Sequence, residues 1–376
     1  MSGEQIAHTF AKATGWPPAV WLSEQLHHTV WNGFTFYDMI FPLFLFIAGV
    51  SMPFSFSGKP KKGIYITMVR RTILLIVLGM VVNGLLKWNG YENTRFASVL
   101  GRIGLAWFFA GLIYLNFGLR GQIVWFVGLL LGYWAVMMWV PVPGYGAGVL
   151  TMQGSLESYI DRLLLPGRLH DGIHDPEGIL STIPAIGTAL LGVFTGTFLR
   201  HNRQRVAGSQ VNAAGSPGSA AGQGAVPSET PGLLIRFTAT PFGKGVTLFA
   251  AGLAFLAIAL LWDLVFPINK RLWTSSFVLY TGGWSLLFLS VFYLVIDVWG
   301  WRKWAVPFIW IGTNAIVIYL ASEGMVNFGF TAAAIFGGLI QYTPQNWQPV
   351  WTAVSVTVVQ LGFLYFLYRH KLFLKI

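Results

Sequence analysis

Apolar residues dominate this chain in runs of about twenty, and short polar links separate the runs. That is the length a helix needs to cross the hydrocarbon core of a bilayer. Read by this length, the chain is predicted to contain nine membrane-spanning helices, at 36–57, 65–86, 99–117, 121–140, 180–199, 245–266, 275–297, 305–321 and 350–368. We therefore expect an all-α polytopic membrane protein in which residues 1–376 form a single helical bundle.

The composition supports this class. Of the 376 residues, 55% are hydrophobic and 10% are charged, whereas a soluble domain carries about 25% charged residues. The formal net charge of +11 would suit a nucleic-acid partner. In a chain this apolar, it is better explained by the excess of Lys and Arg in cytoplasmic loops, so no nucleic acid is expected. The chain has no cysteine, which excludes thiol catalysis, thiolate metal ligands and disulfides.

Basic residues predict the orientation. They crowd the link between the first two spans, at Lys59, Lys61, Lys62, Arg70 and Arg71, so this link is expected to be cytoplasmic. Most other basic residues then fall on the same side, provided that the short apolar patch 325–341 does not cross the membrane. We expect that patch to be re-entrant or to lie at the outer face, the C-terminus to be cytoplasmic, and the segment before residue 36 to face outward.

The segment 206–232 interrupts the apolar pattern. It is rich in Gly, Ser, Ala and Pro, and it cannot bury enough apolar surface to offset the entropy of ordering its backbone. We expect it to be a disordered cytoplasmic linker within the domain.

Three polar residues, His28, Asn32 and Asp38, lie just before or at the start of the first span. Ionisable side chains at a membrane face are costly to desolvate and usually mark a site. A histidine exchanges protons near neutral pH, and a nearby carboxylate orients its ring and stabilises its charged form. The alternatives are an interfacial histidine in ordinary hydrogen bonds, a helix N-terminal carboxylate, and a turn at Asn32-Gly33. The neighbouring His27 is also a candidate for the active imidazole.

Further polar residues lie inside or beside the spans, at Arg70, Arg71, Asn83, Arg102 and Asn314. Intramembrane amides often join helices to one another, and a buried arginine usually pairs with an anion. Arg70 and Arg71 suit either a phosphate-bearing ligand or anionic lipid headgroups.

The string 170–178 (HDGIHDPEG) superficially resembles a metal site, because His170 and His174 are four residues apart with acids between and after them. Its glycines and Pro176 favour a loop, and no third ligand is obvious, so no metal is expected. The acids at its end are predicted to precede the helix near 180. The chain has no phosphate-binding loop, dinucleotide fingerprint or nucleophile elbow.

Several short strings, in this order and spacing, resemble the heparan-α-glucosaminide N-acetyltransferase-like transmembrane acyltransferases, especially their bacterial NagX-like members. The strings cover residues 28–33, 38–42, 46–51, 99–104, 163–167, 175–184, 269–276, 312–315 and 367–376. The resemblance implies transfer of an acetyl or acyl group from cytoplasmic acyl-CoA to an amino sugar such as glucosamine on the periplasmic side of a bacterial inner membrane.

The resemblance also implies site residues. The family's catalytic histidine falls on His28, as general base or acyl relay, with Asp38 and Asn32 beside it. Acetyl-CoA, the donor substrate, is expected at the family motif positions Arg70, Arg71, Asn83, Arg102 and Asn314. Membrane lipids are further expected partners, and a homodimer is left open. The competing class is a transporter of N-acetylglucosamine or another sugar. The absence of inverted repeats and of obvious Gly- or Pro-broken helix pairs weighs against it.

The chain departs from the family pattern in two places. Family members carry a helix upstream that begins Asp-x-x-Arg-Gly, and the present sequence begins just after it. The expectation is therefore nine spans with an outer N-terminus instead of ten. In addition, Ser322 stands beside Glu323 where animal members are expected to carry a histidine.

Overall fold

The structure, a computed structural model, describes residues 2–87, 90–214, 238 and 240–374. Within these ranges the regular secondary structure is helical, apart from two isolated bridges that pair Arg95 with Gly167 and Val142 with Gly146. Eight helices there are long and apolar enough to cross a membrane, and one bent pair raises the number to nine. The predicted all-α polytopic class is confirmed, and the chain is a multi-pass membrane protein.

The candidate spans agree closely with the predicted ones. They are α3 with its leading 3-10 turn (Phe36–Ser55), α4 (Lys61–Val82), α5 (Val99–Asn116), α6 (Leu119–Trp139), the first part of α8 (Thr182–Arg200), α10 (Pro241–Asp263), α11 with its closing π turn (Ser275–Val298) and α15 (Gln348–Arg369). Besides a broken span, four shorter α-helices are present: α1 (Ser2–Thr14), α2 (Pro17–Gln25), α7 (Leu156–Leu164) and α14 (Phe328–Ile340).

The predicted span 305–321 is broken. It comprises α12 (Val306–Thr313) and α13 (Ala315–Leu320), each extended by a short turn, and the two parts meet at an angle of 67° on either side of Asn314. The sequence analysis had considered only helix pairs broken at Gly or Pro, and this break falls at Asn314. The break was hard to foresee, because Asn314 is neither Gly nor Pro and the apolar run continues through it.

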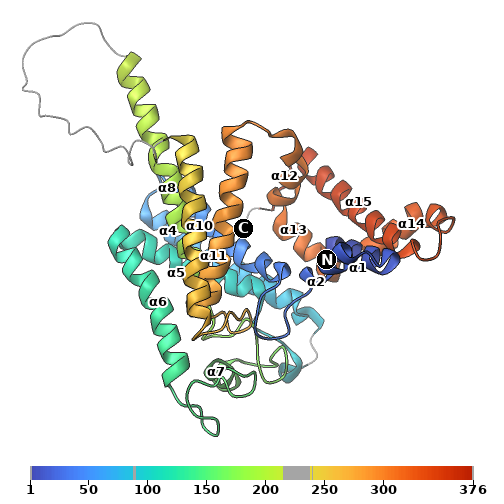
Figure 1. Ribbon diagram of the computed structural model, residues 1–376, viewed down its shortest axis with the longest axis horizontal. Helices are drawn as coiled ribbons and strands as arrows, with labels where there is room; N and C mark the ends of the chain where they lie inside the picture. The colour runs from blue at the N-terminus through green and yellow to red at the C-terminus, as the bar shows by residue number, and fades with distance from the viewer. Residues whose placement is uncertain (1, 88–89, 215–237, 239, 375–376) are drawn as a thin grey trace, which may run out of the picture.

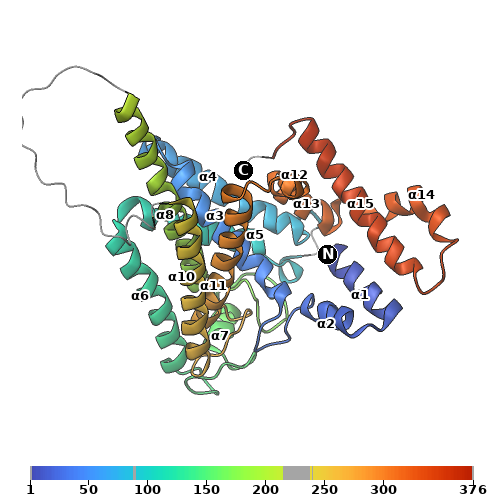
Figure 2. The ribbon, with the colours of Figure 1, turned by 45° about the horizontal axis from the view of Figure 1, so that its top comes forward.

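The helices fall into two groups (Figures 1 and 2). Helices α3, α4, α5, α6, α8, α10 and α11 form the main bundle, and the C-terminal helices α14 and α15 stand to one side of it with α1 and α2 beside them. Helix α7 and its flanking loops lie at one end of the bundle. That is the end at which α3 begins, so the N-terminal site residues lie there.

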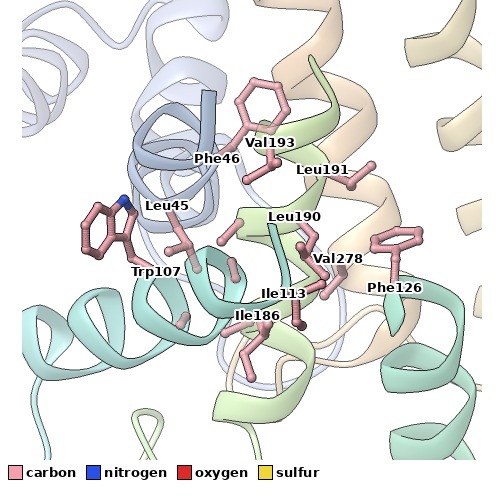
Figure 3. Close-up of a cluster of buried hydrophobic side chains, with 14 of the residues drawn as sticks. Leu45, Phe46, Trp107, Ile113, Phe126, Ile186, Leu190, Leu191, Val193 and Val278 are labelled. Carbon is pink, nitrogen blue, oxygen red and sulfur yellow. The ribbon is translucent and has the colours of Figure 1, made fainter. Parts of the chain in front are cut away.

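Helices α3 and α8 cross with their backbones almost touching. A Cβ atom added to Gly49 would stand 2.1 Å from the Ala189 carbonyl oxygen, and one added to Gly192 would stand 2.0 Å from the Phe46 oxygen. Gly192 and Gly196 form a small-xxx-small pair, which permits this approach in membrane helices. Figure 3 shows the apolar core around the crossing, where α3, α5, α6, α8 and α11 all contribute side chains. The core therefore fixes the start of α3.

Two of the predicted segments are not full membrane spans. The patch 325–341 contains α14, whose 13 residues extend about 20 Å, short of a bilayer core of about 30 Å; its place at the outer face stays a prediction. Of the linker expected at 206–232, residues 215–232 lie outside the described residues. Residues 206–214 belong to α8 (Thr182–Ala214), and the disordered linker stays a prediction.

Candidate active site

The carboxylate of Asp38 is held by the turn that starts α3. Its Oδ2 accepts hydrogen bonds from the Thr29 hydroxyl at 2.7 Å and from the backbone N–H groups of Thr29 and Thr35 at 3.3 and 3.2 Å. The Thr35 bond is half of a capping box, in which a side chain three residues into the helix returns to the N-cap. Asp38 is therefore the helix N-terminal carboxylate considered above, and it is fully buried.

The other Asp38 oxygen faces His28. His28 Nδ1 lies 2.7 Å from Asp38 Oδ1, and the His28 side chain is 51% exposed. A carboxylate on one ring nitrogen favours the tautomer with the proton on that nitrogen. The Nδ1–H group then donates to Asp38, and Nε2 keeps its lone pair. The structure thus brings His28 and Asp38 together, and the carboxylate orients the ring through Nδ1.

The geometry also separates the two adjacent histidines. The Nδ1 atom of His27 lies 2.6 Å from the Ser23 carbonyl oxygen, and its ring packs against the ring of His8 at 5.4 Å between centroids. His27 is thus turned toward α1 and α2, whereas His28 pairs with Asp38. This favours His28 as the candidate active imidazole.

A lysine that the sequence analysis had not placed in the site completes it. Lys270 belongs to the loop between α10 and α11, and its Nζ lies 2.8 Å from His28 Nδ1 and 3.2 Å from Asp38 Oδ1. Burial lowers the pKa of Lys270, and the Asp38 charge opposes this effect. The string 269–276 matches the family pattern, but only the fold brings Lys270 close to His28, which is 242 positions away in the sequence.

The loop that carries Lys270 is a locked turn. The Asn269 side chain accepts from the Leu272 N–H at 2.9 Å, and the Thr274 hydroxyl accepts from the Asn269 N–H at 3.1 Å. Trp273 has φ 50° and is 1% exposed. A bulky residue in this left-handed region costs about 1–3 kcal/mol and persists only where its surroundings impose it.

Asn32 reaches the same turn. Its Oδ1 accepts from Asn269 Nδ2 at 3.0 Å, so it supports the residue that precedes Lys270. Gly33 adopts φ 106° and donates its N–H to the Ile268 oxygen at 2.9 Å, which is the turn considered as the alternative for this pair. Asn32 is exposed, and its catalytic role stays a prediction.

Two residues predicted to bind the donor lie at the same end of the bundle. Asn83 caps the end of α4 and donates from Nδ2 to the Ala97 carbonyl oxygen at 2.6 Å. Arg102 is 2% exposed, lies over the Trp273 ring at 5.2 Å, and donates to Ser181 Oγ and to the Gly178 oxygen. Both side chains join a helix to a loop, which resembles the structural role considered above for intramembrane amides.

The other three residues predicted to bind the donor are dispersed. Arg70 and Arg71 belong to α4 itself, inside the candidate span, and not to the link before it; their long side chains allow a cation to be placed there. Arg70 is exposed and lines an open surface groove, whereas the Arg71 guanidinium lies over the Trp107 ring at 4.5 Å. Asn314 is 2% exposed, and its Oδ1 and Nδ2 have no hydrogen-bond partner among the described residues.

A buried charged network lies behind the site. Arg95 bridges Asp175 and Glu177, Glu157 hydrogen-bonds to Ser181 at 2.9 Å, and Asp161 accepts from the Ile179 N–H at 2.9 Å. Among the described residues, no three His, Asp or Glu side chains are grouped to hold a metal ion.

The pKa values of the network follow from burial. It raises the pKa of Glu157 and of Asp161, and their mutual repulsion raises that of Asp161 further. Burial lowers the pKa of His174 to about 4. The Arg95 guanidinium holds the pKa of Asp175 below its usual range.

Fold and site together define a polytopic α-helical membrane protein with a His–Asp–Lys cluster at one end of its bundle. No protein-family model matches the chain. Over 408 residues it is 28% identical to heparan-alpha-glucosaminide N-acetyltransferase of Homo sapiens, covering 93% of this chain and 55% of that protein. The Mus musculus protein of the same name is 27% identical over 418 residues, covering 93% and 56%.

These two matches support the resemblance to the heparan-alpha-glucosaminide N-acetyltransferases. The NagX-like subgroup stays a prediction. The chain spans about half the length of the curated relatives it matches.

Proposed function

We propose that this protein is a transmembrane acyltransferase that moves an acetyl group from cytoplasmic acetyl-CoA to an amino sugar such as glucosamine on the outer side. We further propose a bacterial inner membrane with a cytoplasmic C-terminus. The observation that carries the proposal is the pairing of half-exposed His28 with fully buried Asp38 at 2.7 Å. Both relatives are named as N-acetyltransferases, which supports the same reaction class.

His28 Nε2 would act as the base. As the amine nitrogen attacks the thioester carbon, its proton passes to Nε2, and Asp38 stabilises the imidazolium through Nδ1–H. Collapse of the tetrahedral intermediate breaks the C–S bond and returns the proton to the CoA sulfur. A relay has the same balance: Nε2 takes the acetyl group and the thiolate leaves; the amine then attacks the acetyl carbon, the bond to Nε2 breaks, and the amine proton passes through the freed Nε2 to the thiolate. The His–Asp geometry is compatible with both routes.

The donor side rests on two observations. Arg70 is an exposed cation on α4, suited to a CoA phosphate. Asn314 presents a buried amide, unpartnered among the described residues, at the break between α12 and α13. Buried polar groups normally find partners, and the amides of the CoA pantetheine arm would supply them. We keep Arg71, Asn83 and Arg102 as proposed supports of this path.

The test is CoA release by the purified protein in detergent, with and without glucosamine, for wild type, His28→Ala and the matched neighbour His27→Ala. We expect glucosamine-dependent CoA release and acetylated product from wild type and His27→Ala, and neither from His28→Ala. A well-folded His28→Ala protein with full activity would overturn the proposed mechanism.

Sugar transport is the second candidate, and the helix break at Asn314 favours it. Broken membrane helices line substrate sites in many transporters. Uptake of radiolabelled N-acetylglucosamine into proteoliposomes, together with absence of acetyl-CoA binding, would establish transport in place of acyl transfer.

A further inference from the structure

The position of Lys270 relative to Nε2 of His28 is the starting point. Its Nζ lies 3.3 Å from His28 Nε2, besides its shorter contacts with Nδ1 and with Asp38 Oδ1. Nε2 is the atom at which the proposed transfer takes place. Any thioester carbon attacked by Nε2, or by an amine hydrogen-bonded to it, would bring its carbonyl oxygen within about 3 Å of this neighbourhood.

Charge balance gives the lysine a task. At rest, the single carboxylate of Asp38 faces both the imidazole and the ammonium. In the transition state a positive charge develops on the ring of His28 and a negative charge on the carbonyl oxygen. Asp38 can neutralise only the first, whereas a cation beside Nε2 neutralises the second. A charge placed in advance where an oxyanion forms is a major source of rate acceleration.

We propose that Lys270 is a further catalytic residue: its ammonium binds the thioester carbonyl oxygen as that oxygen gains negative charge. This inference rests on the proposed function, because it names the group that completes the same site. The chemical step is unchanged. The lysine keeps its proton and donates a hydrogen bond to the oxyanion, and this hydrogen bond weakens when the C–S bond breaks and the carbonyl re-forms.

The turn around Lys270 supports preorganisation over an incidental ion pair. The Asn269 and Thr274 bonds close the turn from both ends, and Trp273 occupies its left-handed conformation inside the protein. Backbone strain of this kind collects at functional sites, where it fixes a side chain in place. The neighbouring Arg271 points elsewhere and pairs with Asp171, so it is a matched control with the same charge and the same turn.

The absence of cysteine permits a direct test of the charge. We would prepare Lys270→Cys and Arg271→Cys, each with a single thiol, and treat both with 2-bromoethylamine. This reagent converts cysteine into a lysine analogue that carries an ammonium. Iodoacetamide provides a neutral adduct as control, and wild type has no thiol to modify. Mass spectrometry measures the extent of modification, and thermal melting in detergent monitors folding.

We expect Lys270→Cys to lose about 10²–10³-fold in kcat with little change in KM for acetyl-CoA. Aminoethylation should restore most of this loss, and iodoacetamide none of it. Arg271→Cys should keep activity throughout.

Full activity of Lys270→Cys, equal rescue by both reagents, or no rescue after complete aminoethylation would each overturn the role of Lys270 while leaving the acyltransferase intact. A wild-type protein that releases no CoA overturns the proposed function and this inference with it.

Discussion

The indole ring of Trp31 packs edge-on against the imidazole ring of His174, with ring centroids 5.3 Å apart. Trp31 lies three residues after His28, and its Nε1–H donates to the Leu150 carbonyl oxygen at 2.8 Å. His174 belongs to the buried charged network. This aromatic contact therefore links the segment that carries His28 to the buried charged network. A change in the ionisation of the network is expected to change the stability of that segment.

The first prediction concerns stability against pH. The raised pKa values of Glu157 and Asp161 mean that the folded state binds protons more tightly than the unfolded state. The free energy of unfolding therefore falls as pH rises from the ordinary carboxyl range toward the raised values. His174 has the opposite sign, because its lowered pKa gives stability that is lost as pH falls below about 6.5. A scan from about pH 6.5 to 9 isolates the carboxyl pair.

In that scan the melting temperature of wild type should fall until the pH exceeds the raised pKa of Asp161, about 8, and then level off. Glu157→Gln should reduce the slope because the amide cannot ionise. Asp171→Asn, which changes an accessible carboxylate of the same loop region, is the control and should keep the wild-type slope. An unchanged slope in Glu157→Gln would show that the pair does not titrate in this range.

The second prediction concerns Asp38. Asp38→Asn should lower kcat by about 10²–10⁴-fold with little effect on KM. The asparagine amide donates to Nδ1 and selects the wrong His28 tautomer, so Nε2 carries a proton and loses its lone pair. Steady-state kinetics with acetyl-CoA and glucosamine measure this loss. Thr29→Val is the control, because it removes only the 2.7 Å hydroxyl bond to Oδ2 and should cost less than about tenfold. Equal losses in both variants would point to a collapsed turn instead of a tautomer effect.

How far the sequence predicts this molecule depends on the range of the interaction. The spans follow from apolar length alone, and all nine predicted positions carry helices in the structure. The pairing of His28 with Asp38 was foreseeable because ten residues and one turn separate them. Lys270 was not, because its approach to His28 depends on the packing of α11 against α3 and on the turn between α10 and α11.

The buried network shows a different limit. Charged residues are almost never fully buried unless they are paired, so an acidic stretch such as 157–177 indicates a hydrated loop. Glu157 and Asp161 are nevertheless fully inside, since Arg102, Arg95 and several hydroxyl groups converge on this region from other elements. No local pattern in the sequence records that convergence.

The third prediction concerns the crossing of α3 and α8. Gly192→Ala should destabilise the folded state by about 1–3 kcal/mol, because the new Cβ would stand 2.0 Å from the Phe46 oxygen and 2.8 Å from the Val50 nitrogen. Both are backbone atoms, so the helices must separate to accept it. Gly132→Ala on α6 is the matched control: nothing lies within 4 Å of its Cβ position, and it should be neutral or stabilising by about 0.5–1 kcal/mol. Thermal melting in detergent distinguishes the two, and equal melting temperatures would contradict the close packing.

The fourth prediction tests the donor side. If Arg70 holds a CoA phosphate, Arg70→Gln removes a charge-assisted hydrogen bond of about 1.5–3 kcal/mol. This predicts a KM for acetyl-CoA that rises about 10–100-fold, with kcat nearly unchanged because the reacting atoms lie at the other end of the donor. Arg120→Gln is the control: Arg120 is also exposed and basic and is predicted to be on the same side of the membrane, but it falls outside the donor set.

The chemistry of the donor sharpens this test. Acetyl-dephospho-CoA lacks the 3′-phosphate, so a side chain that binds this phosphate should lose its effect on KM when that donor is used. A KM that rises equally for both donors assigns Arg70 to the pyrophosphate instead. An unchanged KM for both would show that the exposed arginine of α4 serves lipid headgroups or topology, and the phosphates must then be bound by other basic residues of the chain.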